Sequence, residues 1–144
     1  MRYSLQFKYG TSRARDTQGY NLVTLYVDGA KVARECGGGY DMQGAALGQW
    51  VQSAFQAELL AMSDRAHAEY PRVNGEYIGK NRHYSREERP ALIYGMALVT
   101  DNGKPSKVNI DGACGWSSVR AILDALGFDM FRVTQDVYTV EKKR

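Results

Sequence analysis

The chain is poor in the residues that build covalent or metal frameworks. Its 144 residues include only two cysteines, Cys36 and Cys114, and two histidines, His67 and His83. Two cysteines make a poor disulfide framework, and in a reducing compartment both are expected to be thiols. The histidines stand at no recognisable metal-ligand spacing from the cysteines. We therefore expect neither a metal site nor a bound cofactor.

Long apolar segments are also missing. No apolar run approaches the roughly 20 residues that are needed to span a membrane. The first ten residues, MRYSLQFKYG, lack the continuous apolar core of a signal peptide. These absences predict a cytoplasmic protein with no membrane partner.

A strong charge of one sign is the third absence. The formal net charge is +3 and the isoelectric point is near 8.9, values that permit nucleic-acid binding without requiring it. Hydrophobic residues make up 44% of the chain and charged residues 24%, as in ordinary soluble globular proteins. The length is that of one domain, so we expect a single domain over residues 1–144.

The first part of the chain predicts three strands and a long helix. Residues 3–9 alternate between apolar and polar, and residues 20–36 hold two strand-like runs joined at Asp28-Gly29, a strong hairpin signal. Residues 42–62 predict a helix with Asp41 as its N-cap. Apolar side chains recur there every four residues, at Leu47, Val51, Phe55 and Leu59.

The second part predicts a long polar connector at 64–90, strands at 91–100 and 107–111, a second helix and a last strand at 130–143. The second helix should bury Val119, Ile122, Leu123 and Leu126 and end at Gly127 as its C-cap. The order is βββ–α–ββ–α–β. It favours an α+β fold in which two helices cover one face of an antiparallel sheet.

Cys114 is the one weak catalytic candidate. A thiolate at a helix N-terminus is stabilised by the helix dipole, which lowers the pKa of the thiol. The segment GACGW is similar to the glycine-rich segment around the nucleophile of thiol proteases, but no histidine follows Cys114 to act as the base. The favoured interpretation is that Cys114 packs as a small residue where the chain turns into the helix. The sequence therefore favours a binding role over an enzymatic one.

Glycines before the first helix favour a flexible turn with Asp41 as the helix cap, with a binding loop as the alternative. CGGGYDMQG could present backbone N–H groups to an anion, but it lacks the Gly-Lys-Ser/Thr ending of a phosphate loop, and Asp41 would repel a phosphate. As a binding loop it would let a partner approach the backbone closely, through Gly37, Gly38, Gly39 and Tyr40.

Arginine and tyrosine side chains supply the other candidate contacts. Lys8, Arg13 and Arg15 stand around the first loop, and the connector interleaves tyrosines with basic residues at Tyr77, Arg82, Tyr84 and Arg86. Such a mixture suits stacking with phosphate contact and equally suits a protein–protein hot spot. The connector is nearly neutral overall, so the favoured interpretation is a solvated polar loop.

The segments YNLVTLYVDGAKVARECGGGYDMQGAALGQW and DGACGWSS together resemble small accessory proteins encoded by bacteriophages. The resemblance brings no activity with it. It implies a protein that binds a host or defence-system component in the host cytoplasm, a class that includes inhibitors of CRISPR and other bacterial immune systems. The alternatives are a nucleic-acid-binding module and a cysteine-dependent enzyme that uses Cys114. Neither the partner nor the oligomeric state follows from the sequence.

Overall fold

A computed structural model describes residues 1–37, 41–59, 61, 72–73, 76–77, 100–101, 104–105 and 115–144. Its main elements are β1 (Arg2–Thr11), the 3-10 helix η1 (Arg15–Thr17), β2 (Asn21–Val27), β3 (Ala30–Gly37), α1 (Met42–Ala54), α4 (Trp116–Ala125), β8 (Phe128–Thr134) and β9 (Val137–Lys142). Two short hairpins pair β4 (Arg72–Val73) with β5 (Glu76–Tyr77) and β6 (Thr100–Asp101) with β7 (Lys104–Pro105).

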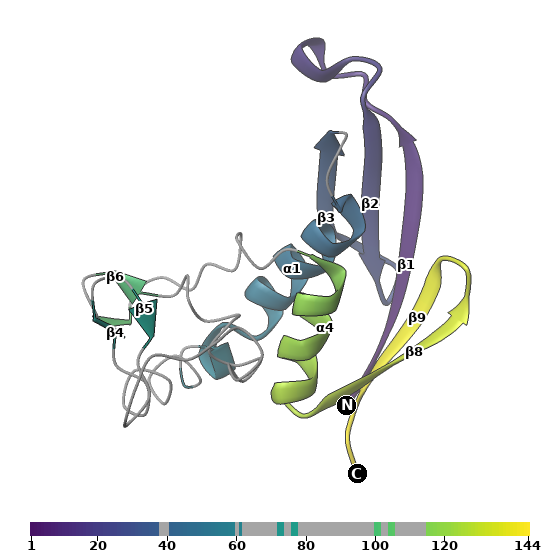
Figure 1. The fold of residues 1–144 in the computed structure, drawn as a ribbon. Coiled ribbons are helices and arrows are strands. Elements are labelled where there is room, and N and C mark those ends of the chain that lie inside the picture. Colours follow the sequence, from purple (N-terminus) through teal and green to yellow (C-terminus); the bar gives the residue numbers. More distant parts are fainter. Residues whose placement is uncertain are drawn as a thin grey trace.

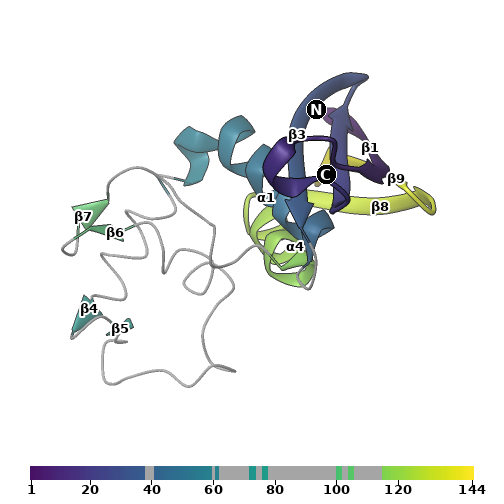
Figure 2. The same ribbon diagram turned by 90° about the horizontal axis from the view of Figure 1, so that it is seen from above.

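The centre of the fold is a five-stranded antiparallel sheet in the order β3-β2-β1-β9-β8. Figures 1 and 2 show α1 and α4 beside each other on the same face of this sheet, where α1 contacts β2 and β3 and α4 contacts β8. The predicted α+β fold, an antiparallel sheet with two helices on one face, is confirmed.

The covered face of the sheet is apolar because alternate strand residues point towards the helices. Leu5 and Phe7 of β1 are buried, as are Val23 and Leu25 of β2 and Val140 of β9. Aromatic rings join the layers: Trp50 of α1 meets the ring of Tyr3 at a centroid distance of 5.2 Å, and Phe55 meets Phe128 at 4.9 Å. Such ring pairs add roughly 0.5–1.5 kcal/mol each beyond the burial of their area.

The hairpin predicted at Asp28-Gly29 is present between β2 and β3. Both turn residues have positive φ, 50° at Asp28 and 85° at Gly29, as a two-residue hairpin turn of the right twist requires. The turn is also tied to β1, because the backbone N–H of Ser4 donates to the Asp28 carboxylate at 2.9 Å and the Asp28 N–H donates to the Ser4 carbonyl at 2.8 Å.

The first helix has the predicted face but is shorter than predicted. All four residues of the expected apolar repeat are buried, at Leu47, Val51, Phe55 and Leu59. However, α1 ends at Ala54, and Phe55 leaves helical geometry before residues 56–59 form a further helical turn. Ala54, the last residue of α1, is exposed. The glycines Gly44 and Gly48 are buried, as expected for a closely packed helix.

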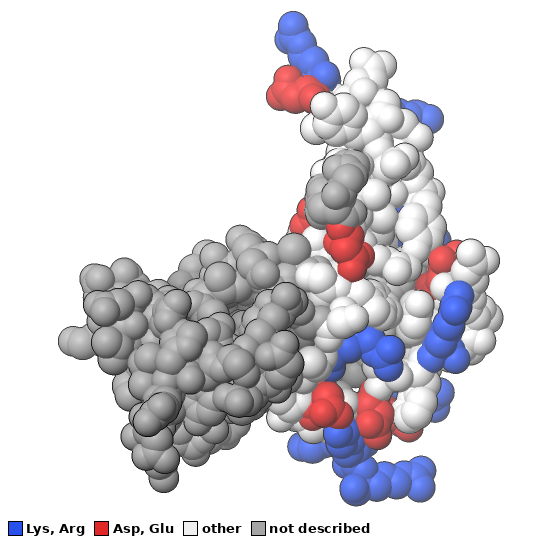
Figure 3. Space-filling view, viewed as in Figure 1, with Lys and Arg blue, Asp and Glu red and all other residues white. Residues whose placement is uncertain are grey.

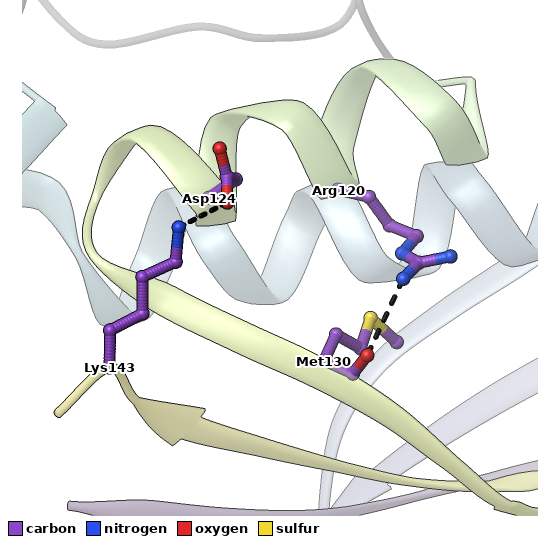
Figure 4. A network of polar contacts seen from close by, with 4 residues as sticks. All are labelled: Arg120, Asp124, Met130 and Lys143. Carbon is purple, nitrogen blue, oxygen red and sulfur yellow. Dashed lines mark hydrogen bonds and ion pairs between the residues drawn. The ribbon is translucent and has the colours of Figure 1, made fainter.

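The second helix, α4, matches its prediction except at Leu126, which is the last residue before Gly127 and is only partly buried. Val119, Ile122 and Leu123 are fully buried, and Gly127 has a φ of 91°, the left-handed geometry of a glycine C-cap. Figure 4 shows two polar contacts that join α4 to the neighbouring strands: Arg120 donates to the Met130 carbonyl of β8, and Lys143, which follows β9, forms an ion pair with Asp124.

The last strand was predicted as one and is two. Residues 130–143 alternate almost without interruption, but Gln135 and Asp136 form a turn between β8 and β9, which pair antiparallel. Apolar residues stand on both sides of the turn, at Val133 and Val137, so the sequence pattern alone does not reveal the break. This hairpin supplies two of the five strands.

Several predictions lie outside the described residues. The strands expected at 91–100 and 107–111 are described only at Thr100, which begins β6. The connector at 64–90 is described only at β4 and β5, which form a short hairpin within it. In the described part of the chain, no helix has both the length and the apolar character that crossing a bilayer requires.

One carboxylate joins the two helices. Asp41 is the N-cap of α1, as predicted, and accepts from the Gly44 N–H at 2.9 Å. Its second oxygen accepts from the N–H of Trp116 at 2.7 Å, in the first turn of α4. The N-cap residue of α4 is Gly115, which has no side chain to cap the helix. Asp41 therefore caps its own helix and a helix 75 residues further along.

We expect Asp41→Ala to lower the free energy of unfolding by about 2 kcal/mol, because a helix cap is worth about 1 kcal/mol and the hydrogen bond to Trp116 about as much again. Asp41→Asn is the matched variant. Asparagine caps α1 equally well but has one acceptor oxygen, so it should lose only about half as much. Denaturant unfolding measures both, and equal losses would contradict a role for Asp41 in capping α4.

Candidate binding site at the η1 loop

The loop between β1 and β2 has a defined internal structure. Ser12 is almost fully buried, and its hydroxyl hydrogen-bonds with the Thr17 hydroxyl at 2.7 Å. Its backbone N–H donates to the Tyr20 carbonyl at 2.8 Å, and its carbonyl accepts from the Gly19 N–H at 3.0 Å. These bonds close the loop across its base. The polar segment predicted here is therefore an ordered projection of the sheet, which we call the η1 loop (residues 12–20).

Two of the predicted site residues lie on this loop. Arg13 and Arg15 are exposed, and Arg15 begins η1. Figure 1 shows the loop projecting beyond the ends of β1 and β2, and Figure 3 shows basic and acidic side chains at its tip. Lys8, expected at the same place, lies instead within β1, opposite Thr24.

A hollow adjoins the base of the η1 loop. It has a volume of about 400 Å³, and its described lining consists of Gly19, Tyr20, Asn21 and Gly37. Gly37, a predicted binding residue, is the last residue of β3 and pairs with Asn21. The structure thus brings the first residue of the predicted glycine loop next to the base of the loop that carries Arg13 and Arg15.

Two tyrosines at this end of the sheet are half exposed, with 55% of Tyr9 and 54% of Tyr20 accessible to solvent. The phenol of Tyr9 accepts from the Gln43 side chain at the start of α1 and hydrogen-bonds with Asp136 of the β8–β9 turn. Partial burial, and then the negative charge of Asp136, raise the pKa of Tyr9 above its usual value. Tyr9 therefore stays a protonated donor at neutral pH and ties three elements together.

Sequence reasoning did not select Tyr9, Ser12 or Tyr20. The only signal for Ser12 was its place in a polar stretch, where serine is ordinarily exposed. Tyr20 was counted within a predicted strand, whereas β2 begins one residue later, at Asn21. Because β2 begins after Tyr20, the Tyr20 side chain belongs to the loop and is half exposed to solvent. The exact ends of strands are poorly marked by the periodicity of the sequence.

The remaining predicted site residues are not placed by the structure. Gly38, Gly39, Tyr40, Arg82, Tyr84, Arg86 and Cys114 lie outside the described residues. Tyr77 belongs to β5, of which only the strand pairing is described. No group of three or more His, Cys, Asp or Glu side chains that could hold a metal ion occurs among the residues described.

We expect Ser12→Ala to loosen the η1 loop. Removing the hydroxyl deprives Thr17 of its partner and the Ala14 N–H of an acceptor at 3.3 Å, a loss of about 1 kcal/mol for a hydrogen bond inside a protein. Amide hydrogen exchange at Ala14 and Thr17 should accelerate, whereas exchange in β9 should not change beyond the global loss of stability. Thr17→Ser keeps a hydroxyl and serves as the control, and unchanged exchange in Ser12→Ala would show that the backbone bonds alone hold the loop.

Comparisons with known proteins found no matching family model, no similar curated protein and no similar solved structure.

Proposed function

We propose that the protein is a small binding protein of the bacteriophage accessory type. It acts in the host cytoplasm by binding a host or defence-system protein complex, in the manner of an inhibitor of bacterial immunity. The observation that carries the proposal is the η1 loop, which projects two exposed arginines and has a hollow of about 400 Å³ at its base. The phage origin rests on the resemblance of the sequence segments.

The composition of this surface supports a protein partner. Arginine and tyrosine are the residues that most often dominate binding energy at protein interfaces, and they do so next to hollows that a partner side chain can fill. Here Arg13, Arg15 and Tyr20 belong to one exposed loop, and Tyr20 lines the hollow at its base. Gly37 adds backbone without a side chain at the rim, which allows a partner to approach closely.

The order of the loop supports the same role. A loop that is already held in one conformation loses little conformational entropy on binding, and so more of its contact energy appears as affinity. The bonds of Ser12 provide this order at the base, while η1 leaves both arginine side chains in solvent. The alternative of an enzyme based on Cys114 has no support in the described residues, because Cys114 lies outside them.

We expect the double variant Arg13→Ala/Arg15→Ala to lose the partner. The protein would carry a C-terminal tag, which lies at the opposite end of the sheet from the η1 loop (Figure 1). Affinity capture from a nuclease-treated bacterial lysate, followed by quantitative mass spectrometry, should recover a protein partner with the unaltered chain. A dominant arginine is worth about 2 kcal/mol or more, which corresponds to a loss of affinity of roughly 30-fold.

The matched control is Arg2→Ala, which removes an exposed arginine from the other end of β1. Its capture should equal that of the unaltered protein. Equal capture by the double variant would remove the η1 loop as the binding surface, and loss of every captured protein on nuclease treatment would contradict a protein partner.

A further inference from the structure

The face of the sheet that points away from the helices carries a compact basic and aromatic surface. Across β1, β2 and β3, the strand register sets side chains in two neighbouring rows, Lys8–Thr24–Arg34 and Gln6–Tyr26–Lys31. We call these six residues the outer grid. Adjacent strands lie about 4.8 Å apart and alternate residues of one strand about 7 Å apart, so the grid is roughly 10 Å by 7 Å.

The orientation of the grid follows from the burial of its neighbours. Phe7, Leu25 and Ala33 are buried under the helices. The adjacent positions on β1 and β2, and Arg34 on β3, therefore point to the opposite face. Lys31 lies two residues before Ala33, but the register shifts between Leu25 and Tyr26, so Lys31 is opposite Tyr26 on the same outer face. Lys8, Gln6, Lys31 and Arg34 are exposed and Thr24 and Tyr26 are partly exposed. The Lys8 ammonium group lies over the Tyr26 ring, 4.7 Å from its centroid, which confirms that the two residues share one face.

The grid holds three cations and no carboxylate. Next to the grid on β2, Asp28 follows Val27 and accepts from the Ser4 N–H, and on β9 the residue opposite Gln6 is the uncharged Val137. Within the described part of the chain, Lys8, Lys31 and Arg34 form no ion pair. A basic surface without internal neutralisation is complementary to a polyanion.

We propose that the outer grid binds single-stranded nucleic acid. The three cations would contact phosphates, and Tyr26 would stack on a base after Lys8 moves from the ring to a phosphate. An open sheet face can meet the exposed bases of a single strand, whereas the bases of a duplex are stacked inside it. An acidic peptide would be attracted by the cations but would gain nothing comparable from the aromatic ring. The single strand is therefore the ligand that uses the whole grid.

This site is separate from the one assigned to a protein partner. Arg13, Arg15 and the hollow at Gly37 take no part in it, and the outer grid takes no part in the η1 loop. The two proposals are tested by different measurements, so either can fail while the other stands. Variants of the η1 loop should alter nuclease-resistant capture of a protein partner, and variants of the outer grid should alter oligonucleotide binding.

The test is fluorescence anisotropy of a labelled oligothymidylate over a series of salt concentrations, with a hairpin duplex of the same length as comparison. Three phosphate contacts to a single strand predict a slope of about −2 for log K against log salt. The single strand should bind more tightly than the duplex. Polyglutamate, as an unlabelled acidic ligand, should compete weakly.

Two variants separate the charges of the grid from its ring. Arg34→Gln should reduce the magnitude of the slope by about 0.7, because one phosphate contact is lost. Tyr26→Leu should weaken binding roughly tenfold with the slope unchanged, which corresponds to the loss of stacking on one base. The control is Arg120→Gln, because Arg120 is an exposed cation on α4, in the helix layer. It should bind like the unaltered protein.

Gly10→Glu provides a second test of nucleic-acid binding, because it adds a negative charge near the outer grid. Gly10 precedes the loop on β1, and nothing lies within 4 Å of a Cβ built there, so a carboxylate can be added beside the grid without steric conflict. It should weaken oligonucleotide binding while the thermal transition stays unchanged. Absence of oligonucleotide binding at low salt, an equal loss in Arg120→Gln, or polyglutamate competing as well as oligothymidylate would each overturn the proposal.

Discussion

The helix layer depends on the carboxylate of Asp41. One of its oxygens caps α1 and the other accepts from the first turn of α4, which begins after a glycine without a cap of its own. The two helix N-termini each carry a partial positive charge, so placing them together would be unfavourable without an anion between them. Asp41 supplies that anion. With both helices held on one face, the apolar side of the sheet is covered, and the opposite face is left to polar and basic residues.

The separation of the two faces explains why one strand can serve two purposes. Along β1, Leu5 and Phe7 build the core, while Gln6 and Lys8 belong to the outer grid. A change on the outer side therefore alters the charge or shape of a surface without leaving a cavity beneath it. β1 ends at Thr11 and the η1 loop follows it directly. There the backbone of Ser12 is hydrogen-bonded to Tyr20 and Gly19, in place of the pairing between β1 and β2. Both proposed binding surfaces thus belong to β1 and its neighbours, and neither uses the helices.

Local signals predicted most of the described fold. Asp28-Gly29 predicted the hairpin because a two-residue turn between twisted strands favours residues that adopt positive φ, and Gly127 predicted the end of α4 for a similar reason. The repeat from Leu47 to Leu59 gave the buried face of α1. The division of residues 130–143 into two strands was missed because Gln135-Asp136 is a weak turn signal. Of the site, Arg13, Arg15 and Gly37 were selected by residue type. The outer grid could not be foreseen, because it arises from the register of β1, β2 and β3, which no local pattern encodes.

The strand order has a consequence for how the chain is synthesised. β1 and β9 are neighbours in the sheet although they are the first and last strands of the chain (Figure 1). The hairpins β1–β2 and β2–β3 can form as soon as they leave the ribosome, but the other edge of β1 stays unpaired until β9 has been made. During that interval β1 offers an open edge to strands of other nascent chains. The alternation of Ser4, Gln6 and Lys8 with the apolar residues of this strand keeps one side of that edge polar and charged, which counteracts association before the sheet is complete.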